Sequence, residues 1–120
     1  MLWKSGQKLR ISSDKEKDMK LFISQPMKDK TDEEILAERD RIIDVVQDMY
    51  PIEDIEVIDS FMQSAPHDAK PLWFLGKSLQ FLADADVAFF AKGWKDARGC
   101  RIEHLCAEEY EIGCIEDAED

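Results

Sequence analysis

Glycine is scarce in this chain, with 5 among 120 residues, and none of them belongs to a phosphate-binding loop. The pattern G-x-G-x-x-G is missing, and so is G-x-x-x-x-G-K followed by Ser or Thr. These absences argue against a dinucleotide-binding Rossmann site and against a P-loop. No apolar run approaches the roughly 20 residues that a membrane helix needs, so we expect no membrane partner.

Residues that form disulfides or bind metals are also few. The three cysteines, Cys100, Cys106 and Cys114, and the two histidines, His67 and His104, show no C-x-x-C or H-x-x-x-H spacing. We therefore expect no metal site and no other cofactor. His104 is expected at the surface, because it points about 100° away from Glu103 around a predicted helix. Unpaired cysteines and the lack of an apolar signal segment predict a cytoplasmic protein.

Positive charge is in short supply: 16 Lys and Arg stand against 27 Asp and Glu, a net charge of −11. Binding to a nucleic-acid polymer needs clustered basic residues, so this partner is not expected, whereas a free nucleoside or nucleotide is not excluded. Residues 1–18 differ from the remainder, with five basic and three acidic residues. We interpret residues 1–18 as a flexible extension and residues 19–120 as a single domain.

The remaining sequence alternates between strand and helix patterns. A capping box at Thr31 and Glu34 predicts a helix that Pro51 ends, Pro71 opens a second helix, and Gly113 is expected to stop a third. The second helix has a predicted apolar face of Leu72, Leu75, Leu79 and Leu82. Strands are predicted at residues 20–24, 55–58, 87–91 and 114–115, and helices at 32–50, 71–82 and 99–112. This β-α alternation predicts an α/β fold, with a mostly parallel sheet covered by helices on both faces.

Glu103 is the main candidate for a functional residue. In a helix that opens at Gly99, Glu103 shares a stripe with Cys100 and Ala107, so small and apolar neighbours surround its carboxylate. Burial of a carboxylate is unfavourable unless it is paired, protonated or used, although the same spacing also allows an exposed glutamate. Ligands of such folds bind at the carboxyl ends of the strands, which here are residues 24–27, 59–61 and 93–94.

These same residues carry a resemblance to a known family. Ile23-Ser24-Gln25-Pro26-Met27 has the form I-S-x-P-M, and a second signature runs from Ala85-Asp86-Val87 through Gly93-Trp94 and Ala97 to Cys106-Ala107. From Met19 onward, over about 100 residues, the chain resembles the nucleoside 2-deoxyribosyltransferase-like proteins, in particular a little-characterised bacterial and phage branch. The resemblance implies a flavodoxin/Rossmann-like three-layer sandwich with a short, mostly parallel four-stranded sheet.

The resemblance also implies a chemistry. In the family a helix-borne glutamate attacks the anomeric carbon of a deoxynucleoside and forms a covalent ester, and Glu103 is the matching position. Trp94 and Phe61 are candidate flat surfaces for a base, and Arg98 for a phosphate. The chain departs from the family at two acid positions, where it has Ser78 and Ala97. The expected substrate-binding residues are Ser24, Gln25, Pro26, Met27, Asp59, Ser78, Gly93, Trp94 and Arg98.

Three functions are therefore open. The first is cleavage or transfer of an N-glycosidic bond in a nucleoside or nucleotide, with Glu103 as nucleophile. The second is a non-catalytic nucleoside- or nucleotide-binding or sensing module, and the third is a scaffold whose cleft holds no ligand. A homo-oligomer is expected in each case, because Trp73, Phe74 and Phe81 exceed what one face of a helix can bury.

Overall fold

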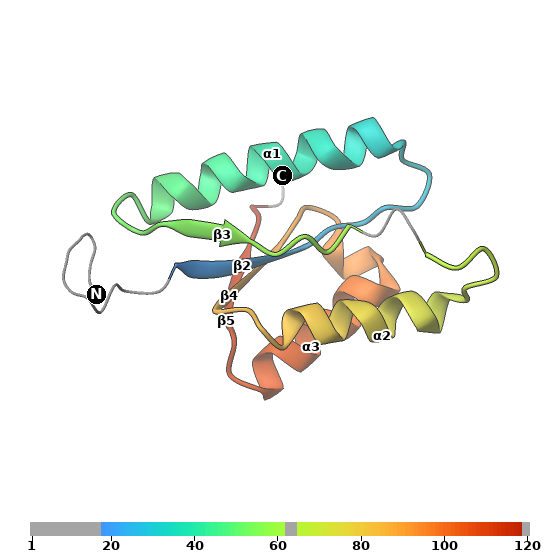
Figure 1. The fold of residues 1–120 in the computed structure, drawn as a ribbon. Coiled ribbons are helices and arrows are strands. Elements are labelled where there is room, and N and C mark those ends of the chain that lie inside the picture. Colours follow the sequence, from blue (N-terminus) through green and yellow to red (C-terminus); the bar gives the residue numbers. More distant parts are fainter. Residues whose placement is uncertain (1–17, 62–64, 119–120) are drawn as a thin grey trace.

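The computed structural model describes residues 18–61 and 65–118 (Figure 1). The predicted extension at residues 1–18 lies outside these residues except for Asp18. The last two residues of the acidic tail also lie outside them. Within the two described ranges, no helix is both long enough and apolar enough to cross a membrane.

A four-stranded sheet forms the centre of the molecule. Its strands are β2 (Met19–Ser24), β3 (Ile55–Val57), β4 (Val87–Phe90) and β5 (Gly113–Glu116), in the spatial order β3-β2-β4-β5. All three pairings are parallel; β2 pairs with β4 from Leu21 opposite Val87 to Ser24 opposite Phe90. The predicted flavodoxin/Rossmann-like α/β architecture is thus confirmed, and every strand pair is parallel.

Helix α1 (Asp32–Met49) covers one face of this sheet (Figure 1). The predicted capping box is present, because the Thr31 hydroxyl accepts from the Glu34 N–H and the Glu34 carboxylate accepts from the Thr31 N–H. Alternate strand residues point to this helix, since side chains of a strand alternate between faces. The core on this side consists of Leu21, Ile23, Ile42, Val46, Val87, Phe89 and Ala91.

Helices α2 (Pro71–Leu82) and α3 (Arg98–Glu109) lie on the opposite face, and a short 3-10 helix η1 (Trp94–Asp96) precedes α3. Figure 1 shows α2 and α3 together below the sheet. The second core consists of Phe22, Leu82, Ala88, Phe90, Trp94, Cys100 and Ala107. β4 contributes to both cores, and its four residues are all buried.

The predicted apolar face of α2 is only partly used for the core. Leu82 is buried, but Leu72 at the other end of the helix is 75% exposed. The main contacts of α2 are with α3, and the residues of α2 that pack in the second core belong to its last turn. The first turns of α2 therefore stand away from the sheet, a position that helical periodicity cannot reveal.

The end of α3 also differs from the prediction. The helix stops at Glu109, and Glu111 adopts a left-handed conformation with φ of 63°. The Ile112 N–H then bonds to the Ala107 carbonyl at 2.9 Å, which closes the helix end. Gly113, the predicted stop, is instead the first residue of β5 and pairs with Val87. The helix ends earlier because Gly113 already pairs with β4, so the chain has to reverse direction at Tyr110 and Glu111.

Candidate functional site

A cleft of about 700 Å³ opens between the carboxyl end of β2 and the helices α2 and α3. Its size falls within the range of small-molecule sites. The polar and charged residues of its lining are Ser24, Gln25, Ser60, Lys70, Ser78, Arg98 and Glu103. The strand ends and the start of α3 thus meet at one place, as expected for a parallel α/β sheet.

Glu103 is buried in this cleft, with 8% of its surface exposed. The Ser24 hydroxyl donates to Glu103 Oε1 at 2.6 Å. Burial raises the pKa of Glu103 above its usual value, and hydrogen bonds from the hydroxyls of Ser24 and Ser78 counteract part of that rise. Among the residues that the structure describes, the partners of this carboxylate are therefore neutral hydroxyls, which orient it without an opposite charge.

Cys100 lies one helical turn before Glu103 on the same buried stripe of α3. Burial raises the pKa of its thiol to about 11; a hydrogen bond with Ser24 lowers it and the charge of Glu103 adds to the rise. Cys100 is therefore a neutral thiol near pH 7. Because a thiolate is the reactive form of cysteine, Glu103 is the better nucleophile of the two.

The loop after β2 is held in place by a buried arginine that the sequence analysis did not identify. Arg39 of α1 is 6% exposed, and it donates to Gln25 Oε1 at 3.3 Å and to the Ile58 carbonyl at 3.1 Å. Gln25 in turn donates to the Ile35 carbonyl at 3.3 Å. Burial lowers the pKa of Arg39, and the charge of Asp59 opposes this effect. Arg39 thus ties the loop after β2 to the end of β3.

Most of the predicted site residues come together. Of the ten residues expected to act on or bind substrate, the cleft is lined by Ser24, Gln25, Pro26, Met27, Ser78, Arg98 and Glu103. Ser78, at a position where the resemblance implies an acid, is hydrogen-bonded to Glu103 itself. Ala97, at the other such position, also lines the cleft.

Three predicted residues, Asp59, Gly93 and Trp94, do not line the cleft, and neither does Phe61. Asp59 is exposed and acts on Arg39 through its charge. Gly93 adopts a left-handed conformation with φ of 85°, and an added Cβ there would lie 3.4 Å from Pro26 Cγ. Gly93 therefore lies against Pro26 of the loop after β2. Trp94 is buried in the second core, together with Cys100 and Ala107 of α3.

An apolar wall of the cleft was not predicted. It comes from the first half of α2, where Leu72, Phe74 and Leu75 face the opening. From the sequence, Leu72 and Leu75 were expected on the apolar face of the helix and Phe74 in a subunit contact. Ser78, on the same side of the helix as Leu75 and Leu82, was the available signal, because a polar side chain there is consistent with a helix face that borders a cleft. The cleft thus offers an apolar side opposite the Glu103 carboxylate.

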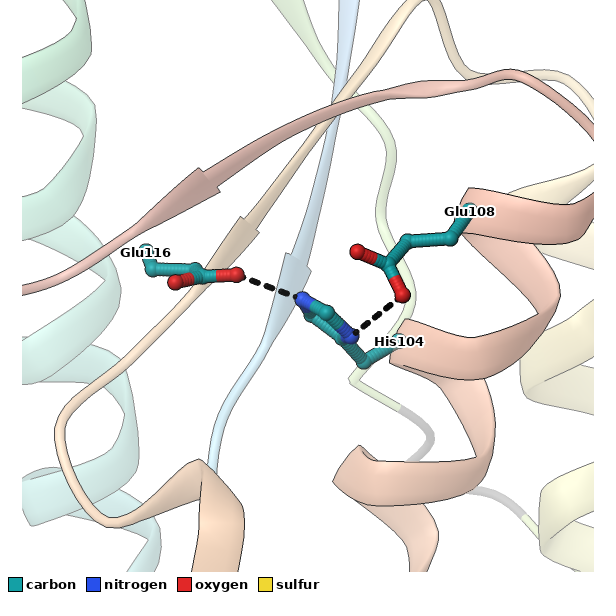
Figure 2. Close-up of side chains that lie close together, drawn as sticks. All are labelled: His104, Glu108 and Glu116. Carbon is teal, nitrogen blue, oxygen red and sulfur yellow. Dashed lines mark hydrogen bonds and ion pairs between the residues drawn. The ribbon is translucent and has the colours of Figure 1, made fainter.

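His104 is buried, with 8% of its surface exposed, so its predicted surface position was wrong. Its ring stacks on Trp94, with centroids 4.1 Å apart and planes 18° from parallel. His104 Nε2 lies 2.7 Å from Glu116 Oε2, and Nδ1 lies 3.6 Å from Glu108 Oε1. Figure 2 shows the imidazole between these two carboxylates. Sequence reasoning missed this cluster because Glu116 is brought in by the pairing of β5 with β4.

Comparison with known proteins is informative only for the fold. No protein-family model matches the chain, and no curated protein matches it. A crystal structure of a protein from Enterococcus faecalis V583, described as a conserved protein, is similar, with a TM-score of 0.60 and 12% sequence identity. The match covers 83% of this chain and 63% of the other, so the chain spans less than two thirds of that protein. At this identity the likeness establishes a shared fold alone.

Proposed function

We propose that the protein cleaves or transfers the N-glycosidic bond of a deoxynucleoside or deoxynucleotide, with Glu103 as the nucleophile. The observation that supports this most is the Glu103 carboxylate itself, which is buried in the cleft and held by hydroxyl groups. A carboxylate without a cationic partner keeps its lone pairs available for attack on an electrophilic carbon.

The reaction follows from these residues in two steps. A Glu103 oxygen bonds to the anomeric carbon while the carbon–nitrogen bond breaks, and the electron pair of that bond leaves with the base, which takes up a proton from solvent. Water or the nitrogen of a second base then attacks the same carbon, gives up a proton to solvent and releases the carboxylate. Two successive inversions give net retention. The hydrogen bond from Ser24 holds the attacking group in position.

The remaining lining suits the other parts of a nucleotide. Phe74 and Leu75 provide an apolar surface for a flat base, and Arg98 and Lys70 provide positive charge for a phosphate. These two cations and the Glu103 carboxylate are the charged groups of the cleft lining, so the lining carries more positive than negative side chains.

A second candidate is a nucleoside- or nucleotide-binding module without turnover. Ser78 and Ala97 favour it, because neither can donate a proton to a departing base as a carboxylic acid would. The same cleft and the same residues then hold the ligand, and Glu103 accepts a hydrogen bond from a sugar hydroxyl.

One experiment separates the two candidates. The protein is incubated with each deoxynucleoside and each deoxynucleoside monophosphate, free base is measured by chromatography, and intact mass is measured for a deoxyribosyl adduct. We expect free base from the wild type, a loss of several orders of magnitude in Glu103→Gln, and no loss in the matched control Glu109→Gln. If the protein binds one of these compounds, releases free base from none of them and carries no adduct, the binding module is established and the enzyme is excluded.

A further inference from the structure

The setting of His104 is unusual among the described residues because the orientation of its ring is fixed on every side. One face stacks on Trp94, and the ring meets Phe90 edge-on with centroids 4.7 Å apart. A carboxylate stands beside each nitrogen (Figure 2). The stacking fixes the plane of the ring, and within that plane the observed orientation is the one that places both nitrogens beside carboxylates.

The hydrogen bond at Nε2 determines what the other nitrogen can do. A carboxylate oxygen can only accept, so the 2.7 Å contact between Glu116 Oε2 and His104 Nε2 requires the proton to be on Nε2. In a neutral ring the lone pair is then on Nδ1, and it faces Glu108 Oε1 at 3.6 Å. Two electron-rich atoms that face each other repel, so a positive species between them is favourable.

That species is either a proton or a metal ion, and the separation fits a metal ion. Two ligand atoms of a tetrahedral zinc ion lie about 3.3–3.4 Å apart, which follows from metal–ligand distances of about 2.0–2.1 Å. The observed 3.6 Å is close to this value and is too long for a direct hydrogen bond. His104 and Glu108 are also four residues apart on α3, a spacing that places both side chains on one face of a helix.

We propose that His104 Nδ1 and Glu108 form a binding site for a divalent transition-metal ion of the zinc type. Glu116 holds the Nε2 proton, the arrangement by which carboxylates commonly orient a metal-binding histidine. Glu116 stays on Nε2, so the ligands that this chain gives the ion are His104 Nδ1 and Glu108 Oε1, and water completes its coordination. Imidazole nitrogen together with carboxylate oxygen favours zinc, nickel or copper over magnesium or calcium.

This site is separate from the proposed glycosidic chemistry and does not depend on it. His104 packs on Trp94, which does not line the cleft. Its effect is structural: the site joins the last turns of α3 to the end of β5, and α3 also carries Glu103. Sequence spacing alone predicted no metal site, because the third residue comes from a separate strand.

Trp94 provides a direct readout. The chain has three tryptophans, so Trp3→Phe together with Trp73→Phe leaves Trp94 as the only one. Titration of this full-length variant with Cu²⁺ should quench its fluorescence and saturate at one equivalent, because the ion binds the ring that stacks on Trp94. Excess Zn²⁺ should restore the signal, and Zn²⁺ alone should raise the melting temperature.

Single substitutions test whether the ion binds at Glu108. Glu108→Gln removes an exposed ligand that the fold does not need, and it should weaken the apparent Cu²⁺ affinity at least about ten-fold. Glu109→Gln, at the adjacent exposed position, and His67→Gln, which removes the other histidine, should leave the titration unchanged. Equal affinities in Glu108→Gln and Glu109→Gln would overturn the proposal. So would a Trp94 signal that changes with pH but not with Zn²⁺ or Cu²⁺, because the position would then hold a proton.

Discussion

At the scale of single residues, the ionisation of Glu103 determines both its reactivity and its effect on stability. Burial raises its pKa above the usual value of 4.5, and two serine hydroxyls limit that rise. The folded protein therefore holds a proton over a pH range in which the unfolded chain has already lost it. Across that range the contribution of Glu103 to stability falls as pH increases.

The first prediction follows from this decrease in stability with increasing pH. Glu103→Gln carries a neutral side chain of the same shape, so it should be more stable relative to the wild type at pH 8 than at pH 4. The free energy of unfolding of both proteins, measured by urea titration across this range, tests it. A difference that does not change with pH would mean that the pKa of Glu103 is the same in the folded and unfolded states.

The second prediction concerns Arg39. Arg39→Met removes the donor to Gln25 Oε1 and the Ile58 carbonyl, and leaving buried acceptors unpaired should cost about 1–3 kcal/mol in the free energy of unfolding. Arg101→Met is the matched control, because Arg101 is exposed and donates to the Lys95 carbonyl at the surface, so its loss should cost about 0.5 kcal/mol or less. Urea denaturation measures both values. Equal losses would contradict the role given to Arg39.

At the scale of secondary-structure elements, the end of α3 provides a third prediction. Glu111 is left-handed, with φ of 63°, a conformation that is unfavourable for residues with a Cβ. Glu111→Gly relieves a strain of about 1–2 kcal/mol but makes the unfolded chain more flexible, so we expect a net stabilisation of up to about 1 kcal/mol, measured as a higher urea midpoint. Leu105→Gly, at an exposed position in the middle of α3, should destabilise it by about 1 kcal/mol. A loss of stability in Glu111→Gly would show that the Glu111 side chain makes a favourable contribution of its own.

The elements themselves were largely predictable from the sequence, because they depend on local patterns. The capping box at Thr31, Pro71 at the start of α2 and the apolar runs of β2 and β4 are each read within a few residues. What each helix faces depends on the rest of the fold. The sequence therefore identified α2 but not the apolar cleft wall formed by Phe74 and its neighbours.

The same distinction holds for the candidate site. Glu103 and the loop of residues 24–27 were found because strand ends of a parallel sheet converge. Arg39 was missed although it interrupts the apolar positions Ile35, Ile42 and Val46 of α1, a visible signal for a buried charge. The cluster around His104 had no such signal, because its three members meet only after β5 pairs with β4.

At the scale of the whole molecule, the described surface retains exposed apolar side chains on α2. Trp73 and Phe74 are 37% and 36% exposed, and their rings contact each other edge-on at 5.1 Å. Phe74 also lines the cleft, whereas Trp73 does not. We propose that a second copy of the chain packs on Trp73 and leaves the cleft side of Phe74 free for a ligand, because adjacent exposed aromatic residues are typical of subunit contacts.

The fourth prediction tests this contact. Light scattering at micromolar concentration should give about twice the monomer mass of 13.9 kDa, and Trp73→Lys should shift the protein to monomer. Gln80→Lys, an exposed change near the other end of α2, should leave the mass unchanged. A wild type that is monomeric at every concentration would refute the dimer.

The strand order has a further consequence, for the rate at which the protein folds. β2 lies between β3 and β4, and its pairing with β4 joins segments far apart in the chain: the Asp86 N–H bonds to the Lys20 carbonyl across 66 positions. Such a pair forms only after a long loop has closed, and the entropy of that closure is lost before the pairing is gained. We therefore expect refolding in milliseconds or slower, well behind helical bundles of similar size, with the central pair β2–β4 as the rate-limiting contact.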